Sequence, residues 1–309
     1  MKKSILFFIS VMIATLMFGQ SANTWFNRGV SKYYKTDYKG AIVDYTKSIE
    51  ENPELAKTYL SRGIAKYYLQ DFEAAIADQM EAIKLDPNYA DAYFNIADCK
   101  YNLQDYEDAI RYYTKALEIN PKDPMALVSR GLTKQYIKDY EGAVEDFSQT
   151  IKIKPRLADA YIYRGVAKIY LEKYDEAMKD FSKSISIQPL SDAFYYRGIV
   201  WGAKDDQKSS LKDYNKAIKL NSKNYRALHN RGVLKIALND NKSAVDDFSK
   251  AILINSHYGD AYYNRGVAEL NLGHKDNACN DFKKALELGQ INAKRAIKMD
   301  CNVTSSDNN

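Results

Sequence analysis

Apolar residues along this chain recur with helical periodicity in segments of about a dozen residues. The segments come in pairs, and a short polar turn joins each pair, such as TDY over Thr36–Tyr38 and KDY over Lys138–Tyr140. Each pair therefore predicts a helical hairpin. A proline, which cannot continue a helix, follows the second segment of the first five pairs. These prolines are Pro53, Pro87, Pro121, Pro155 and Pro189.

A small residue marks each hairpin at the same place, and its spacing indicates that the hairpins are repeats. The markers are Gly29, Gly63, Ala97, Gly131, Gly165, Gly198, Gly232 and Gly266, which follow one another at 34 residues with one step of 33. A fixed period of this length is typical of a solenoid, in which a unit cannot bury its apolar face alone. We therefore expect one elongated all-α domain over residues 20–300. Its repeats lie near 22–55, 56–89, 90–123, 124–157, 158–190, 191–224, 225–258 and 259–289.

Several places inside a repeat hold recurring residue types. In the fifth repeat, counted from residue 158, Tyr161 is fourth, Gly165 eighth, Ala177 twentieth, Phe181 twenty-fourth and Pro189 thirty-second. This pattern resembles the tetratricopeptide repeat, and eight repeats fit it. The resemblance implies a right-handed solenoid of eight helical hairpins that binds a protein or peptide segment in its concave groove.

Two repeats depart from the family pattern. Gln79 stands where the second repeat should carry its aromatic residue, and Ser210 replaces the alanine of the sixth. We expect looser packing at both places. The fifth repeat is also one residue short, and this shortening together with Ser210 predicts a flexible joint between repeats five and six.

An arginine precedes the marker residue in seven repeats, and an aspartate lies sixteen residues after that arginine in the same seven. The third repeat has neither, because Ile96 and Tyr112 occupy the two places. Joint presence and joint absence predict a structural ion pair between the two helices of a hairpin. The alternative is two independently solvated charges. The predicted pairs are Arg28–Asp44, Arg62–Asp78, Arg130–Asp146, Arg164–Asp180, Arg197–Asp213, Arg231–Asp247 and Arg265–Asp281.

The amino-terminal segment has a different pattern. Lys2 and Lys3 precede an apolar run over residues 4–18, and small or polar residues follow it. This layout is typical of a secretory signal, and the run is shorter than the roughly 20 residues of a membrane-spanning helix, which makes a retained anchor the less favoured alternative. We expect a cleaved signal peptide over residues 1–19 and a secreted or periplasmic protein with no membrane span after cleavage. A polar tail covers residues 301–309.

The charge balance and the histidines indicate no catalytic or nucleic-acid-binding site. Without Lys2 and Lys3, 43 basic and 40 acidic side chains remain, with no long block of one sign. His229, His257 and His274 share no metal-ligand spacing with one another or with the cysteines. A phosphate-binding loop and a nucleophile motif are also lacking. The sequence therefore predicts a protein without enzymatic activity, cofactor or metal.

The three cysteines fall into two groups. Cys99 occupies a place that other repeats fill with small residues, so we expect a buried free thiol. Cys279 and Cys301 lie at similar distances on either side of Gly289. If residues 291–300 fold back as a capping helix, the two sulfurs lie level, and the closing segment also resembles that of secreted bacterial tetratricopeptide repeat proteins. We expect a disulfide between Cys279 and Cys301.

A stripe on the first helix of the repeats is the candidate partner-binding surface. By the family resemblance it lines the concave groove, and it is rich in tyrosine, which is enriched in binding hot spots. The candidate residues are Phe26, Tyr33, Tyr34, Tyr67, Tyr68, Phe94, Tyr101, Tyr136, Ile162 and Tyr170. The alternative is that these rings pack on one another between repeats and stiffen the array.

The kind of partner is only partly limited by the sequence. Family members that bind chaperone C termini carry lysine and asparagine at the fifth and ninth places, where the fifth repeat has Ile162 and Val166. We therefore expect an interaction scaffold, a monomer or weak oligomer, that binds a different protein or peptide. Two alternatives stay open: a glycan-binding protein of the cell envelope, and a structural component of an envelope or secretion assembly.

Overall fold

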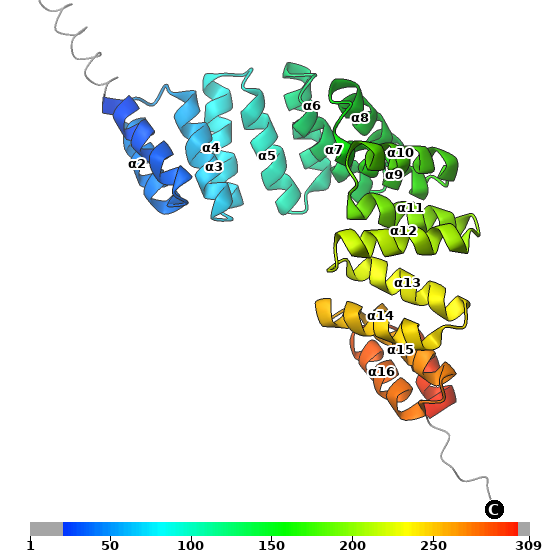
Figure 1. Ribbon diagram of the computed structural model, residues 1–309. Coiled ribbons are helices and arrows are strands. Elements are labelled where there is room, and N and C mark those ends of the chain that lie inside the picture. Colours follow the sequence, from blue (N-terminus) through cyan, green and yellow to red (C-terminus); the bar gives the residue numbers. More distant parts are fainter. Residues whose placement is uncertain (1–20, 302–309) are drawn as a thin grey trace, which may run out of the picture. The chain divides into compact units, whose positions relative to one another are not determined.

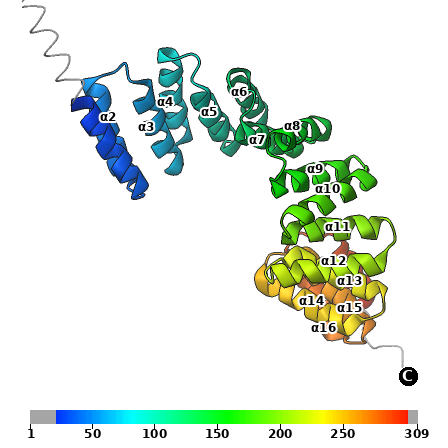
Figure 2. The ribbon, with the colours of Figure 1, turned by 45° about the horizontal axis from the view of Figure 1, so that its top comes forward.

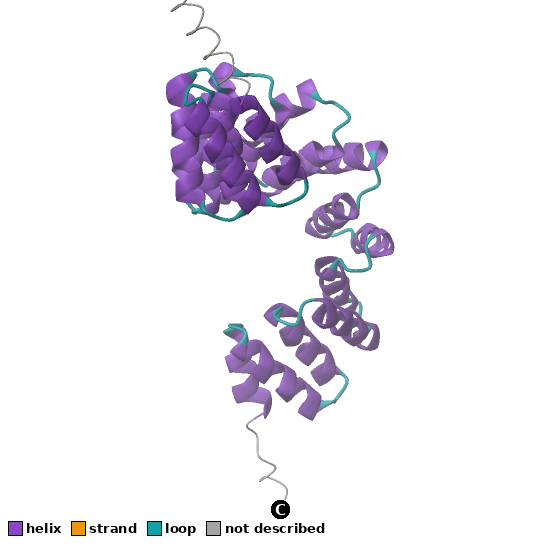
Figure 3. Ribbon diagram, turned by 90° about the vertical axis from the view of Figure 1, so that its left-hand side faces the viewer, coloured by secondary structure: helices purple, strands orange, loops and turns teal. Residues whose placement is uncertain are grey.

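The computed structural model describes residues 21–301, and the regular secondary structure of this part is helical throughout, as Figure 3 shows. The predicted signal peptide and the tail beyond residue 301 lie outside the described residues. The chain forms two compact units that divide between Pro155 and Arg156. Each unit contains four helical hairpins, which confirms the all-α solenoid class.

The first unit holds repeats one to four. Residues 21–34 form its first helix. The helices that follow are α2 (Tyr38–Glu51), α3 (Ala56–Tyr68), α4 (Phe72–Leu85), α5 (Ala90–Asn102), α6 (Tyr106–Ile119), α7 (Pro124–Tyr136) and α8 (Tyr140–Ile153). From α2 onward each helix packs on the next, both inside a hairpin and between neighbouring hairpins; Figure 1 follows this order from blue to green.

The second unit holds repeats five to eight and a carboxy-terminal cap. Its hairpin helices are α9 (Ala158–Tyr170), α10 (Tyr174–Ile187), α11 (Ser191–Ala203), α12 (Gln207–Leu220), α13 (Tyr225–Ala237), α14 (Asn241–Ile254), α15 (Gly259–Asn271) and α16 (Lys275–Glu287). The cap consists of α17 (Asn292–Ala296) and a π-helical turn, η1 (Ile297–Cys301). Figure 2 shows α9 and α10 as neighbouring helices of one hairpin.

The single continuous domain of the sequence analysis stays a prediction, and the helices group into two compact units of four hairpins each. Hairpins in a repeat array pack on their neighbours, so no common core holds distant repeats together. The unit boundary at Pro155 lies outside the predicted flexible joint between repeats five and six, which also stays a prediction. Helices α10 and α11, on either side of that joint, pack together inside the second unit.

Each hairpin turn combines a left-handed residue with the start of the second helix. In repeats one to seven this residue has φ between +58° and +67°, and Gly273 with φ of +80° takes the place in repeat eight. A residue in this conformation ends a helix and redirects the chain. In several repeats an aspartate then caps the second helix: Asp37 accepts a hydrogen bond from Gly40 N–H, and Asp139 accepts one from Gly142 N–H. The polar turns of the sequence are these turn-and-cap segments.

The marker glycine leaves room for the aromatic ring at the twenty-fourth place of its own hairpin. A Cβ atom added at Gly131 would lie 2.7 Å from Phe147 Cε1, and one added at Gly165 would lie 2.7 Å from Phe181 Cε1. Both rings are fully buried. The two helices therefore approach closely because the ring of one fills the space over the glycine of the other.

The two departures from the pattern do not loosen the packing, and that prediction was wrong. Ser210 is buried and its hydroxyl donates to the Gly198 carbonyl oxygen at 2.8 Å. Gln79 is buried beside Gly63, and its Nε2 donates to the Leu60 carbonyl oxygen at 3.2 Å. Each polar side chain fills its place and bonds to the backbone of the facing helix.

The arginine and aspartate of the seven predicted pairs meet between the two helices of each hairpin. In repeat four, Arg130 Nη2 lies 2.6 Å from Asp146 Oδ1, and Arg130 Nε lies 3.0 Å from Asp146 Oδ2. The other six pairs are bidentate in the same way. Asp146 is almost completely buried, so a charge-assisted pair lies inside the hairpin core.

Two further contacts of the arginine pair were not predicted. Lys134, one turn after Arg130, places its Nζ 2.9 Å from Asp146 Oδ2, and repeats one, two, five and seven have the same lysine contact. Arg130 Nη1 also donates to Thr114 Oγ1, on the second helix of the preceding repeat, at 3.0 Å. The arginine therefore connects neighbouring hairpins as well as the two helices of its own hairpin.

The carboxy-terminal cap closes the second unit as a helical segment folded against α16. Ala293 packs with Ala278, Phe282 and Ala285 of that helix. A disulfide joins Cys279 of α16 to Cys301 at the end of η1, as the sequence predicted. The cap is therefore held against the last repeat both by side-chain packing and by a covalent bond.

Candidate functional site

The candidate surface lies on the first helices of the first unit. We call it the first-helix face and define it by the fifth, ninth, twelfth and thirteenth places of repeats one to four. These residues lie on one side of each helix because they are spaced by four, seven and eight residues. They are Phe26, Val30, Tyr33, Tyr34, Leu60, Ile64, Tyr67, Tyr68, Phe94, Asp98, Tyr101, Asn102, Val128, Leu132, Gln135 and Tyr136.

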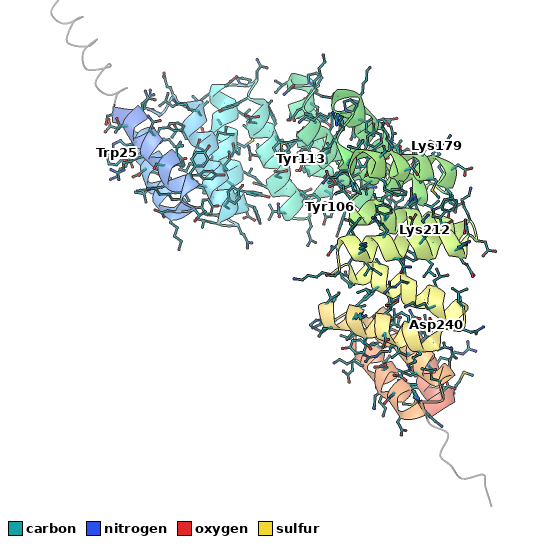
Figure 4. The ribbon with its side chains drawn as sticks, in the orientation of Figure 1. Trp25, Tyr106, Tyr113, Lys179, Lys212 and Asp240 are labelled. Atoms are coloured by element: carbon teal, nitrogen blue, oxygen red, sulfur yellow. A yellow bond between two sulfur atoms is a disulfide. The ribbon has the colours of Figure 1, made fainter. Side chains whose placement is uncertain are left out.

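The tyrosines of this face pack on one another between successive repeats. Between repeats one and two, the Tyr68 ring lies 5.8 Å from that of Tyr33 and stacks at 5.0 Å on that of Tyr38. Between repeats three and four, the Tyr136 ring centroid lies 4.3 Å from that of Tyr106, which Figure 4 labels on α6. Tyr101 also lies 6.4 Å from Tyr136, ring to ring. Ring packing between repeats, the alternative that the sequence left open for these tyrosines, is therefore observed.

Several of the same tyrosines are nevertheless open to solvent. Tyr34 is 81% exposed, Tyr136 is 61% exposed and Tyr68 is 51% exposed. Tyr33 and Tyr67 lie deeper and are half-buried. The rings of the thirteenth place are thus held by neighbouring rings on one side and leave the other side accessible.

The remaining predicted groove residues differ in accessibility. Phe26 and Phe94 are half-buried against Tyr45 and Tyr113, at ring distances of 5.8 Å and 5.6 Å. Tyr170, in the second unit, is largely exposed.

Ile162 is a correction, because it is buried and cannot line an open groove. It packs with Ala177, Phe181, Ala193 and Val200, so it belongs to the core shared by repeats five and six. An apolar side chain at the fifth place turns toward the neighbouring helices when small residues leave room for it.

A shallow cavity opens on the first-helix face between repeats one and two. It has a volume of about 150 Å³, and its lining residues are Val30, Tyr33, Tyr34, Tyr45, Ser61 and Ile64. Burial raises the pKa of Tyr45 to about 12. This phenol therefore stays protonated at neutral pH and presents a hydroxyl rather than a charge to the cavity.

Asp98 is the one charged residue among the sixteen of this face, and the recurring residue pattern did not single it out. Tyr113 Oη, on α6, donates to Asp98 Oδ1 at 2.5 Å. Burial raises the pKa of the Asp98 carboxyl to about 6, although the hydrogen bond from Tyr113 opposes that shift. A count of residue types at the ninth place would have identified it, because the other seven repeats are apolar there.

The histidines lie in the second unit and have separate environments. His229 is buried, and its Nε2 lies 2.9 Å from Asn264 Nδ2 of the next repeat. Burial lowers the pKa of His229 below its usual 6.5. His274 Nδ1 lies 2.6 Å from Glu269 Oε2, and His257 is exposed. Within residues 21–301 there is no group of three or more histidine, cysteine or acidic side chains placed to hold a metal ion.

Comparison with known protein families identifies the family to which this array of hairpins belongs. Models described as Tetratricopeptide repeat match residues 56–89, 90–123, 158–189, 225–258 and 259–290, more than half of the chain. The chain belongs to the tetratricopeptide repeat family. Each matched segment begins where the sequence pattern starts a repeat. Curated proteins provide no significant sequence match.

Several solved structures share the fold, and the first named here is a tetratricopeptide repeat protein. One, from Parabacteroides merdae, is 21% identical with a TM-score of 0.65 and covers 80% of this chain and 99% of its own. Yeast Tom70 is 20% identical with a TM-score of 0.58, over 89% of this chain and 62% of its own. The MamA protein is 26% identical with a TM-score of 0.51, over 55% of this chain and 93% of its own. Among the described residues, no helix has the length and apolar character needed to cross a membrane.

Proposed function

We propose that this tetratricopeptide repeat protein is a non-enzymatic interaction scaffold that binds an extended peptide or protein segment on its first-helix face. The observation that most supports this is the set of exposed tyrosines Tyr34, Tyr68 and Tyr136. Each ring is also in contact with a neighbouring tyrosine ring, which limits the entropy that binding would remove. Rigid, amphipathic rings of this kind are common anchors of binding surfaces.

We also propose that the protein works outside the cytosol. The amino-terminal pattern of Lys2, Lys3 and an apolar run supports this, and so does the Cys279–Cys301 disulfide, because disulfides persist in oxidising compartments. Amino-terminal sequencing of the protein from fractionated cells tests the proposal. We expect a chain that begins near Gln20 in the periplasmic or secreted fraction; an uncleaved chain in the cytosol would contradict it.

Site-specific photo-crosslinking tests the proposed face directly. A benzoylphenylalanine in place of Tyr136 lies on the first-helix face, and one in place of Glu145 lies on the exposed side of α8 in the same hairpin. In envelope extract we expect discrete protein adducts from the Tyr136 position and none of the same mass from the Glu145 position. Adducts from the Glu145 position alone would show that the partner contacts the second helices of the hairpins instead. Retention on a polysaccharide array without protein adducts would favour the glycan-binding alternative.

A further inference from the structure

The ninth place of the repeats contains one charged residue in an otherwise apolar row. Repeats one, two and four of the first unit carry Val30, Ile64 and Leu132 there, and the second unit carries only valine and isoleucine. Asp98 is also the only charged residue among the sixteen that define the first-helix face. A carboxylate here is not required by the hairpin, because seven repeats fold without one.

In its own repeat, Asp98 occupies a place whose counterpart in repeat one lines the cavity between repeats one and two. That cavity is lined by the ninth, twelfth and thirteenth places of one repeat together with residues of the next. In repeats three and four the same places hold Asp98, Tyr101, Asn102 and Leu132. On the side of repeat two, Tyr67 Oη accepts a hydrogen bond from Asn102 Nδ2 at 3.0 Å. The tyrosines near the carboxylate are therefore Tyr67 of repeat two and Tyr113 of α6.

No cation of the described residues lies within ion-pair distance of Asp98. The buried aspartates of other repeats have an arginine partner, and often a lysine as well. In repeat three that arginine is replaced by Ile96. Lys100, two residues from Asp98, instead contacts Asp105 at 2.8 Å and Asp108 at 3.2 Å. Tyr113 alone donates to the Asp98 carboxylate in this part of the chain.

The charge of the whole first unit has the same sign as this carboxylate. Residues 21–155 contain 21 acidic and 18 basic side chains, whereas the remaining described residues, 156–301, contain 18 acidic and 25 basic ones. A partner drawn to this face by charge is therefore a basic one.

We propose that Asp98 binds the side chain of a lysine or arginine in the extended segment that occupies the first-helix face. The segment's apolar residues then contact the tyrosines on either side of Asp98. This inference rests on the proposed function, since it requires that a peptide segment binds the face at all. The partner's cation supplies to Asp98 the kind of positive charge that the aspartates of the seven ion pairs receive from their own repeats. Partly buried carboxylate sites of this kind favour a charge-assisted hydrogen bond.

Selection from a displayed library of random peptides on the complete mature protein tests the inference. Three versions of the protein are compared: wild type, Asp98→Asn, and Asp91→Asn as a matched control. Asp91 is an exposed aspartate on the same helix, α5, about two turns nearer its start, so its loss removes the same charge without changing Asp98 or its contact with Tyr113. Asp98→Asn keeps an oxygen that accepts from Tyr113, which preserves the local fold.

We expect lysine or arginine to be enriched at one register position among peptides selected by wild type and by Asp91→Asn, and not by Asp98→Asn. Replacing that basic residue in a selected peptide by norleucine weakens binding to wild type by about 10- to 100-fold and changes binding to Asp98→Asn little. Acidification to about pH 5 weakens the binding of the lysine peptide to wild type in the same way, because it protonates Asp98.

The outcomes that contradict the inference differ from those that contradict the proposed function. Selected peptides without a basic preference, or with the same preference on Asp98→Asn, overturn the role of Asp98 and leave peptide binding in place. No peptide enriched above an unrelated control protein overturns the proposed function, and the inference with it.

Discussion

At the residue scale, Asp98 shows how a binding position differs from a folding position. Its carboxyl pKa is raised from 3.8 to about 6 by burial, and its sole hydrogen-bond donor among the described residues is Tyr113. The folded protein therefore holds the Asp98 proton more tightly than the unfolded chain does. The charged carboxylate lowers stability above about pH 6, and this loss disappears as the pH falls toward about 4. A residue that lowers stability in a folded array is a functional candidate.

Asp98→Asn is therefore expected to stabilise the protein at neutral pH. We expect a gain of about 1 kcal/mol near pH 7, a figure reduced for the partial exposure of the carboxyl, because the substitution removes the buried charge. The gain shrinks to nothing near pH 4. Denaturant unfolding of wild type and variant at both pH values measures it, with Asp91→Asn as control. A variant less stable than wild type at neutral pH would show that the carboxylate contributes to the fold.

At the scale of the elements, the arginine network holds helices and hairpins together. Arg130 reaches Asp146 on its own second helix and Thr114 on the previous one. The same relation explains the exception in repeat three: Ile96 replaces the arginine there, and Met80 replaces the hydroxyl residue of the repeat before it. Repeat three thus lacks the arginine together with both of its partners, the aspartate of its own hairpin and the hydroxyl residue of the preceding repeat.

A double-mutant cycle on Arg130 and Asp146 measures this contribution. We expect Arg130→Ala to lower the free energy of unfolding by about 2 to 4 kcal/mol, somewhat less than a fully buried pair, because Lys134 still contacts Asp146. The double variant with Asp146→Ala should lose less than the sum of the two single losses. Lys152→Ala, an exposed change on α8, should have no effect. Simple additivity of the two losses would mean that the pair contributes no coupling.

The elements themselves were largely predictable from the sequence, because the repeat period multiplies each signal eight times. The glycine markers, the polar turns and the sixteen-residue spacing all correspond to observed hairpin features. The errors occurred where one side chain replaces another: Gln79 and Ser210 restore the packing through hydrogen bonds to backbone, which a residue pattern does not reveal. Ile162 lies in the core for a different local reason, because it packs against Phe181 and Val200.

The candidate site was less predictable than the fold. Its tyrosines were found from their spacing, but exposure separates Tyr34 and Tyr136 from the half-buried Tyr33 and Tyr67, and exposure depends on which neighbouring ring covers each. Asp98 was not predicted because the pattern rests on recurring residues, whereas a charged residue stands only once at the ninth place.

At the scale of the whole molecule, the two units present different surfaces to a partner. The first carries the exposed rings of Tyr34, Tyr68 and Tyr136, together with Asp98 and an excess of acidic side chains. The second has more basic side chains and ends in the disulfide-bonded cap. Figure 4 labels two exposed lysines of its second helices, Lys179 and Lys212. We assign partner capture to the first unit and leave the second without a predicted ligand.

The most direct test of this account is the affinity of a library-selected peptide for a protein carrying Tyr34→Ser and Tyr136→Ser together. Both rings are more than half exposed, so their loss should leave the helical circular dichroism nearly unchanged. Leu253→Ser, an equally exposed apolar change on α14 of the second unit, is the control. We predict that the tyrosine variant loses at least about tenfold in affinity by titration calorimetry while the control binds like wild type. Undiminished affinity of the tyrosine variant, with its helicity intact, would contradict the claim that the first-helix face binds the partner.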